Sequence, residues 1–435
     1  MQYISTNDKG PRVSLAEAVL RSAPRGGGLY MPRTLPVIPE AFFMNFDEMN
    51  FREIAYVIAN QLFGADVESA ALKGIVDASF NFQAPLVKLA DDMYAIELFH
   101  GPTLAFKDYG ARFMARLISH LHSHGRRGGE QLHVLIATNG NTGSAVANAF
   151  AGISNVVCHI VFPRGHAGRQ LEAQFTTLGG NIRAWEVQGT IDDCHSLVQQ
   201  AYADEDLNRR LALTSANSVN IGRLLPQTFY YFYAMSRLRG RIGKGTPVAV
   251  AVPAGNLGNL TAAVTARRMG LRIDRLIACE NANSYLTDLL AKGHAEAPRA
   301  IPTLAAAADK GTPTNIDRLK HLCQNSLGAL RHELEAYSYD DAAIIAGVNG
   351  CYEATGYTPD PHTALAYMAL RDHKRPGETG LIIATGHPAK SLTAMSAITG
   401  RAMDLPLQLT RFMTGNDLRR KLPPSYTALR NALLS

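Results

Sequence analysis

Short apolar runs rich in β-branched residues alternate with amphipathic stretches of helical length from about residue 94 onward. Near-continuous apolar strands need cover on both faces, and strands that alternate with helices are typical of parallel sheets. The pattern therefore predicts an α/β fold whose parallel sheets carry helices on both faces. The expected strands are 132–138, 155–163, 248–254, 275–280 and 380–386, and the expected helices include 192–204, 222–238 and 259–269.

The first 93 residues lack this alternation, and we interpret them as a mainly helical region. A helix is expected to begin at a Ser14 cap and to stop at a glycine run before Tyr30. Residues 40–76 also carry apolar side chains at helical spacing. No linker separates this region from the rest of the chain. Ligands of such parallel sheets bind at the carboxyl ends of the strands, so the chemistry is expected there.

Composition excludes several classes of protein. With 46% hydrophobic and 18% charged residues, the chain is a globular protein rather than a disordered one. Its 5 cysteines are dispersed and form no CxxC pair, which argues against disulfides and structural zinc, and no metal is expected. We expect a cytoplasmic protein without membrane insertion, because no apolar run approaches about 18 residues. The net charge of +6 is spread along the sequence and gives little support for nucleic-acid binding.

One loop pattern, Gly-Asn-x-Gly between a strand and a helix, occurs twice. The first glycine loop is residues 138–143, and the second glycine loop is residues 255–259. Glycines let the backbone turn with its N–H groups outward, and a helix start adds about half a positive charge. The pair therefore predicts two anion sites, although each loop alone could be an ordinary strand-to-helix turn. Neither loop is a Walker A motif or a GxGxxG dinucleotide fingerprint.

Lys107 opens a predicted helix whose buried stripe includes Phe113 and Leu117. It shares a face with Met114, so partial desolvation is expected, and the first turn of a helix disfavours a cation. Both effects lower the pKa of a lysine, and a neutral lysine can form a Schiff base with an aldehyde. A lysine whose stem packs on the surface while its amine reaches water is the competing interpretation.

Several motifs, in order along most of the chain, resemble those of the threonine synthases, which use pyridoxal 5′-phosphate. The most specific is ELFHGPTLAFKDYGARFMARL at 97–117, similar to the cofactor-lysine segment of that family. The resemblance implies the tryptophan-synthase-β-like fold (fold type II), with two α/β domains over 94–240 and 241–435 around a buried cofactor. The other matching segments are GGGLYMP (26–32), LGGNI (178–182), TIDDC (190–194), NSVNIGRLLPQTFYYF (217–232), PAGNLGN (253–259), GYTPDPHTA (356–364) and ATGHPAKS (384–391).

The resemblance also implies a role for each matching residue. Lys107 matches the Schiff-base lysine, Asn141 stands near the ring 3-oxygen of the cofactor, and Thr385 faces its pyridine nitrogen. The cofactor phosphate is expected on backbone N–H groups of the second glycine loop, at Gly255, Asn256, Leu257, Gly258 and Asn259. The substrate carboxylate is expected on the first glycine loop, at Thr138, Asn139, Gly140, Thr142 and Gly143.

The implied reaction converts O-phospho-L-homoserine and water into L-threonine and phosphate, by γ-elimination and β-addition of water. The departing phosphate needs cationic and N–H support, for which Ser218, Asn220 and Arg223 are the candidates. An ordinary helix start with a solvent-facing arginine is the alternative for these three residues. The expected partner is a small phosphorylated amino acid, and the chain is expected to be a monomer or a small homo-oligomer.

The sequence departs from the family near the expected site. Asn139 and Asn141 replace a serine and an aspartate, His166 replaces a lysine, and alanines fill 305–308. These changes leave open a paralogous enzyme that carries out β-elimination or γ-replacement on another anionic amino acid. A non-catalytic protein of the same fold is a further alternative, although Lys107 and the second glycine loop argue against it. The roles of His387 and of Asp360, a cofactor neighbour or a helix cap, also stay open.

Overall fold

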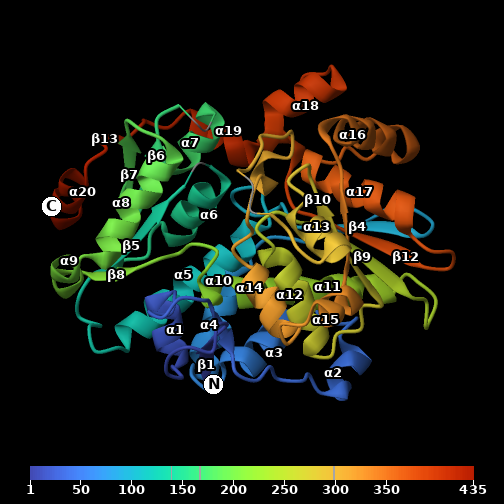
Figure 1. The fold of residues 1–435 in the computed structure, drawn as a ribbon, viewed down its shortest axis with the longest axis horizontal. Coiled ribbons are helices and arrows are strands. Elements are labelled where there is room, and N and C mark those ends of the chain that lie inside the picture. The colour runs from blue at the N-terminus through green and yellow to red at the C-terminus, as the bar shows by residue number, and fades with distance from the viewer. Residues whose placement is uncertain (139, 166–167, 297–298) are drawn as a thin grey trace.

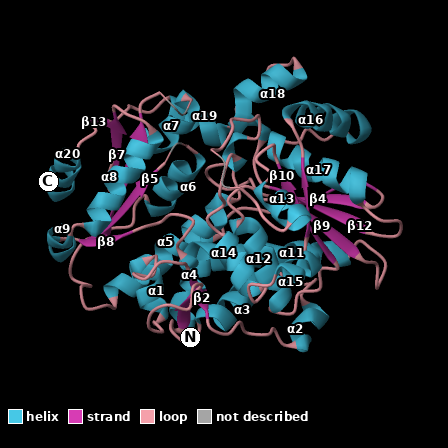
Figure 2. Cartoon of the chain, in the orientation of Figure 1, coloured by secondary structure: helices cyan, strands magenta, loops and turns pink. Residues whose placement is uncertain are grey.

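The computed structural model describes residues 1–138, 140–165, 168–296 and 299–435, and within them it builds two separate parallel sheets (Figure 1). Figure 2 shows the sheets on opposite sides of the molecule, with helices and loops between them. The first sheet has five described strands, all parallel, and is on the left in Figure 1. In spatial order they are β13 (Arg420–Leu422), β7 (Ile182–Val187), β6 (Val156–Pro163), β5 (Leu132–Ala137) and β8 (Ala212–Thr214).

The second sheet has six strands among the described residues and is parallel except at one edge, where β3 runs antiparallel to β4. The predicted strands at 132–138, 155–163, 248–254, 275–280 and 380–386 are all confirmed as members of the two sheets. In spatial order the strands of the second sheet are β11 (Glu335–Ser338), β10 (Arg275–Glu280), β9 (Val248–Pro253), β12 (Thr379–Ala384), β4 (Met93–Glu97) and β3 (Leu86–Ala90).

Both sheets are covered on both faces, as the apolar strands predict. In β9, Val250 packs with the core beneath α12 (Gly258–Arg268), whereas its neighbour Ala251 packs with α17 (Pro361–His373) on the opposite face. In β5, Ile136 packs with α6 (Asn141–Phe150), and Leu135 packs with α8 (Ile191–Ala203). Alternate side chains of each strand therefore enter different cores, which is why the strands read as continuous apolar runs.

The N-terminal region is mainly helical and lies beneath the two sheets in Figure 1. Ser14 caps the first helix as predicted, but the helix ends at Arg21, because Ser22 has a φ of 70°. The helical spacing over 40–76 corresponds to three helices, the last of which continues to Ser79. The elements are β1 (Tyr3–Ser5), α1 (Leu15–Arg21), β2 (Tyr30–Pro32), α2 (Glu40–Asn45), α3 (Phe51–Phe63) and α4 (Ser69–Ser79), and β1 pairs antiparallel with β2.

The remaining helices connect the strands or close the chain. Those not yet named are α5 (Lys107–Ser123), α7 (Arg169–Thr176), α9 (Glu205–Arg210), α10 (Ile221–Leu224), α11 (Thr228–Arg239), α13 (Tyr285–Lys292), α14 (Ile316–Leu322), α15 (Leu327–Glu333), α16 (Asp341–Thr355), α18 (Leu392–Thr399), α19 (Leu407–Met413) and α20 (Tyr426–Leu434). Three 3₁₀ turns are described, η1 (Leu225–Gln227), η2 (Ala306–Ala308) and η3 (Pro388–Ser391). No helix in the described part of the chain is both long and apolar enough to cross a bilayer.

The sheets exchange strands across the expected domain divisions. Strands β3 and β4 precede or open the range 94–240 yet belong to the six-stranded sheet, and β13 returns from the C-terminus to the five-stranded sheet. The divisions at residues 93/94 and 240/241 therefore stay a prediction. The carboxyl ends of β5, β9 and β12 lead directly into the two glycine loops and Thr385, where parallel sheets bind ligands.

Candidate active site

Lys107 is the first residue of α5, and the backbone before it is attached to the end of β12. The Phe106 N–H donates to the Thr385 carbonyl at 2.9 Å, and the His387 N–H donates to the Leu104 carbonyl at 3.1 Å. Leu104 has a φ of 54°, a left-handed conformation that non-glycine residues rarely adopt. These contacts bring Lys107 and Thr385, far apart in the sequence, to the same end of the sheet.

Two buried charged residues fix the turn that precedes Lys107. The carboxylate of Asp108 accepts hydrogen bonds from the N–H and the hydroxyl of Thr103, at 2.9 and 2.6 Å. The Lys390 amine donates to the Thr103 carbonyl at 2.6 Å. A side chain at Gly101 would place its Cβ 2.4 Å from Asp108 Oδ2, so only glycine fits there. The turn is thus held from α5 and from the segment after β12 together.

The pKa of Lys107 is lowered to about 7, mainly by burial and then by the positive charges of Arg223 and Lys390. Sequence reasoning attributed such a shift to burial and to the helix start, and it missed the two cations. Burial likewise lowers the pKa of Lys390 to about 8 and that of Arg223 to about 10. Among the described residues, the Lys107 amine makes no hydrogen bond, and its Nζ is 5.0 Å from the centre of the Phe106 ring. The amine is therefore available for a ligand.

The depressed pKa of Lys107 predicts a pH dependence of stability. Folded Lys107 releases its proton near pH 7, whereas an unfolded lysine keeps it to about 10.5. Between these values the unfolded state binds more protons, so the free energy of unfolding of the cofactor-free chain is expected to rise with pH. Urea unfolding at pH values of about 7 and about 9 measures this rise.

Lys107→Met is expected to reduce that rise without abolishing it, since the lowered pKa of Lys390 acts in the same direction. Equal rises in the variant and the unchanged chain would contradict the assignment of a depressed pKa to Lys107.

The first glycine loop is organised around Thr138. Its Oγ1 accepts the N–H groups of Gly140 and Gly143 at 3.2 and 3.0 Å, so these groups are used within the loop. Gly140 has φ 154° and ψ −110°, a conformation open essentially to glycine alone. Thr142 and Asn141 then open α6, and the buried Oδ1 of Asn141 has no partner among the described residues. Asn139 and His166 lie outside the described residues.

The second glycine loop turns its side chains toward the scaffold. Asn256 donates to Ser218 Oγ at 2.8 Å and accepts the Thr314 N–H at 2.6 Å. The side-chain oxygen of Asn259 accepts the hydroxyls of Tyr230 and Tyr231 at 2.6 and 2.7 Å. Within the described part of the chain, no backbone N–H of Gly255, Asn256, Leu257 or Gly258 donates to a protein acceptor. Unpaired N–H groups at the start of α12 are the arrangement that binds a phosphate.

The residues present fit pyridoxal phosphate. Arg223, Lys390 and Lys310 all act on the Lys107 amine as positive charges, and Asp360 is the carboxylate that opposes them. The excess of positive charge suits a cofactor and a substrate that both carry phosphate. The side-chain amide of Asn141, which has an unpartnered end and can donate through its nitrogen, the N–H groups of the second glycine loop and the amine of Lys107 supply the three kinds of group that such a cofactor needs.

Two of the residues expected to support the departing phosphate have other partners. Asn220 is fully buried, caps α10 and donates to the carbonyls of Val19 and Ser215, both at 2.9 Å. Ser218 accepts from Asn256, as described above. Arg223 is also buried, and one of its nitrogens donates to the Ala216 carbonyl at 3.1 Å. Of the three, Arg223 is the one whose charge reaches Lys107.

Sequence reasoning missed the buried network behind the second glycine loop. Arg318 is fully buried in α14 and donates to the Tyr30 carbonyl of β2, to the Val219 carbonyl at 2.6 Å and to Asn315 Oδ1 at 2.8 Å. Asn315 in turn donates to the Asn256 carbonyl at 2.9 Å. The network thus ties the N-terminal region to the loop, and nothing in the local pattern IDRLKHL distinguishes this arginine from a surface one.

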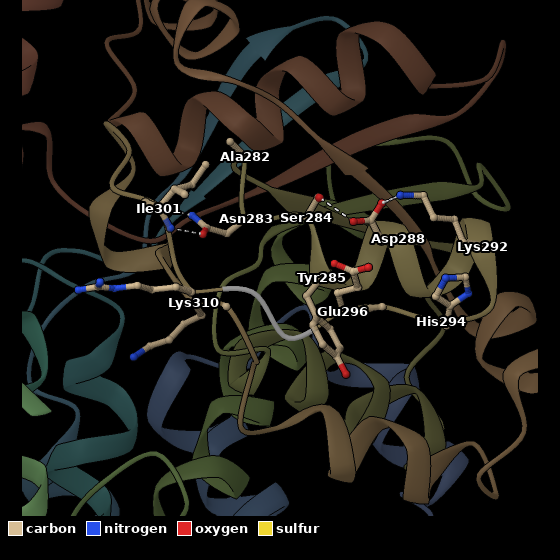
Figure 3. Close-up of a pocket in the computed structure, with 13 residues that line it drawn as sticks. Ala282, Asn283, Ser284, Tyr285, Asp288, Lys292, His294, Glu296, Ile301 and Lys310 are labelled. Carbon is tan, nitrogen blue, oxygen red and sulfur yellow. Dashed lines mark hydrogen bonds and ion pairs between the residues drawn. The ribbon is translucent and has the colours of Figure 1, made fainter.

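A pocket of about 410 Å³ opens beside this site, between α13 and the segment that follows it (Figure 3). Inside it Asp288 pairs with Lys292 at 2.9 Å and accepts the Ser284 hydroxyl at 3.1 Å. Lys310 lines the same pocket, and its side chain points away from the Asp288–Lys292 pair in Figure 3. Since Lys310 also lowers the pKa of Lys107, the pocket borders the site.

Comparison with known proteins accounts for nearly the whole chain. Residues 82–386 match the family of pyridoxal-phosphate dependent enzymes, and residues 2–80 match the threonine synthase N terminus. A threonine synthase of Escherichia coli strain K12 is 38% identical over 438 residues, covering 100% of both chains.

Solved structures agree with these matches. The crystal structure of threonine synthase from Escherichia coli superposes with a TM-score of 0.90 at 37% identity, covering 100% of this chain and 99% of the other. A PLP-bound threonine synthase from Brucella melitensis superposes with a TM-score of 0.94 at 29% identity, covering 100% and 98%. The predicted fold class is confirmed, and the chain belongs to the threonine synthase family of pyridoxal-phosphate dependent enzymes.

Proposed function

We propose that this chain converts O-phospho-L-homoserine and water into L-threonine and phosphate, with pyridoxal 5′-phosphate as its cofactor. The observation that carries the proposal is one amine of lowered pKa, Lys107, placed among Arg223, Lys390 and Lys310. That arrangement suits a reaction in which a lysine moves protons while a phosphate leaves. Family membership over the full length of the chain supports the same substrate and does not favour the paralogous alternative.

The cofactor would be held by groups from both sheets. Lys107 would bind its aldehyde, and the N–H groups of Gly255, Asn256, Leu257, Gly258 and Asn259 would bind its phosphate. Asn141 would contact the ring 3-oxygen, and Thr385 would face the pyridine nitrogen. When bound, the cofactor supplies an electron sink for charge that develops at the substrate carbons.

Lys107 is the proton carrier in this proposal. With a pKa of about 7, its amine is substantially neutral near neutral pH and can accept a proton from the substrate Cα or Cβ. The turn before it is held by Asp108 and Lys390, so the backbone of Lys107 at the start of α5 is fixed in position. A base fixed in this way loses little freedom when it reacts.

The ends of the substrate are assigned to different elements. Because Thr138 occupies the N–H groups of Gly140 and Gly143, we assign the carboxylate to the N–H groups of Asn141 and Thr142 at the start of α6, which donate to no acceptor among the described residues. We assign the departing phosphate to Arg223, with Lys390 and Lys310 adding positive charge. Ser218 and Asn220 then act through the scaffold, by holding Asn256 and α10.

An assay of the purified chain with its cofactor tests the proposal. Incubation with O-phospho-L-homoserine is expected to release phosphate and to form L-threonine in equal amounts, measured by a phosphate assay and by chromatography of amino acids. Turnover of a different anionic amino acid, with negligible activity on phosphohomoserine, would instead support the paralogous enzyme.

A further inference from the structure

The turn η2, formed by three of the four alanines at 305–308, lies directly against the second glycine loop. A Cβ at Gly255 would stand 2.5 Å from the Ala308 Cα and 2.9 Å from the Ala308 carbonyl oxygen. Both are backbone atoms, which cannot move aside as a flexible side chain can. Gly255 and Ala308 therefore touch backbone to backbone, and the position of one sets the position of the other.

Polar side chains hold this turn at its middle and just after its end. On one side, Asp309 accepts the N–H and the hydroxyl of Thr303 at 3.1 and 2.7 Å and the amide of Asn281 at 2.8 Å. On the other side, the Ala307 N–H donates to His362 Nε2 at 3.2 Å. Asp309 thus anchors the turn to the end of β10, and His362 anchors it to the start of α17.

The hydrogen bonds of His362 specify one form of the ring. Because Nε2 accepts the Ala307 N–H, it carries no proton, and Nδ1 must donate to Asp360 Oδ2, 2.8 Å away. Asp360 is almost fully buried, and its other oxygen accepts the N–H of Thr363 at 2.9 Å and also the Thr363 hydroxyl. The carboxylate therefore caps α17 and orients the ring at the same time.

We propose that Asp360 and His362 form a positioning pair for the cofactor-phosphate loop. Asp360 selects the tautomer of His362, His362 holds the Ala307 N–H, and the turn then fixes Gly255 at the start of the second glycine loop. The inference rests on the proposed role of that loop in binding the cofactor phosphate. It explains why a buried carboxylate and a histidine stand together away from any hydrogen bond to Lys107.

Binding of two cofactor forms to the cofactor-free chain isolates this role. The informative ratio is the dissociation constant of pyridoxal divided by that of pyridoxal 5′-phosphate. Hemiacetal formation by free pyridoxal is the same for every variant, so a change in this ratio between variants reports on the phosphate loop. His362→Ala is expected to weaken pyridoxal 5′-phosphate about fivefold, the effect of one partly accessible hydrogen bond, and to change pyridoxal less than about twofold. Isothermal titration calorimetry measures both constants without any turnover.

Two further variants test the tautomer. His362→Gln is expected to restore most of the ratio, since its amide oxygen can accept the Ala307 N–H. Asp360→Asn is expected to lower the ratio as His362→Ala does, because an amide N–H facing Nδ1 puts the ring proton on Nε2, opposite the Ala307 N–H. Any effect of Asp360 on Lys107 acts on both cofactor forms and cancels in the ratio. The matched control is His332→Ala, an exposed histidine of α15.

The possible outcomes separate the inference from the proposed function. If the unchanged chain binds pyridoxal as tightly as pyridoxal 5′-phosphate, the second glycine loop does not bind the phosphate and the proposed site is wrong. If the unchanged chain distinguishes the two but the variants keep the same ratio, the positioning pair is refuted. Thermal unfolding of each cofactor-free variant checks folding, and the Gln and Asn variants decide the result should the Ala variant fail to fold.

Discussion

Lys107→Ala is expected to abolish covalent attachment of the cofactor and to lower the rate of threonine formation by about 10³-fold or more. Alanine has no amine to bind the aldehyde and no base to move a proton at the substrate. The scaffold of the turn remains, since Asp108, Thr103 and Lys390 make their contacts without the Lys107 side chain. The loss is therefore chemical rather than structural.

Absorbance and mass spectrometry together measure this result. After borohydride treatment, the unchanged chain is expected to carry the reduced cofactor on the peptide that contains residue 107, and the variant is expected to carry none. Lys73→Ala is the matched control, because Lys73 is exposed on α4 and pairs with Asp77 at the surface. A variant at 107 that kept full activity would refute both the assignment of Lys107 and the proposed mechanism.

Arg223→Gln is expected to lower kcat/KM for the phosphorylated substrate by about 10²- to 10³-fold, since a buried cation that stabilises a departing anion is lost. Inorganic phosphate should inhibit the variant more weakly than the unchanged chain. Removal of this charge also raises the pKa of Lys107, because Arg223 is the largest electrostatic contribution to its depression. The amine then stays protonated to higher pH, so the acidic limb of the pH–rate profile shifts upward.

Arg223→Lys separates the two effects. It keeps a positive charge near Lys107, so the acidic limb is expected to stay in place, while the fixed guanidinium geometry is lost and kcat/KM still falls. Arg52→Gln, at an exposed position of α3, is the control for a change of net charge. Unchanged phosphate inhibition in Arg223→Gln would show that the phosphate leaves elsewhere in the pocket.

Sequence reasoning predicts five of the long buried strands, but it misses β7 and β4, which are also long and buried. The runs that became β5, β6, β9, β10 and β12 were predicted because each enters two cores. Strands β8 and β13 have three residues each, too few for a periodic signal, and β11 is only partly buried. The position of each of these three strands is set by its pairing with a neighbouring strand, and a local sequence pattern carries no information about that pairing.

The candidate site, too, could be predicted only in part from the sequence. Lys107 and the two glycine loops lie in local motifs that the sequence displays. Lys390 and Arg318 instead act on residues far away in the chain: Lys390 binds Thr103, 287 positions away, and Arg318 binds Tyr30, 288 positions away. The second role of Asp360, in orienting His362, shows a further limit of prediction from the sequence. Its sequence context offers a helix cap as one of two roles, and Asp360 does cap α17, but the hydrogen bond of its second oxygen to His362 depends on the tertiary fold.

The return of β13 to the five-stranded sheet has a consequence for how the chain is made. Strand β7 emerges from the ribosome long before its outer neighbour, Arg420–Leu422, has been synthesised. Until then one edge of β7 offers unpaired backbone groups to any other extended chain. A nascent or truncated chain that lacks β13 would thus leave β7 as an exposed edge strand, which β13 covers in the complete chain. Premature termination before β13 is therefore a route to aggregation.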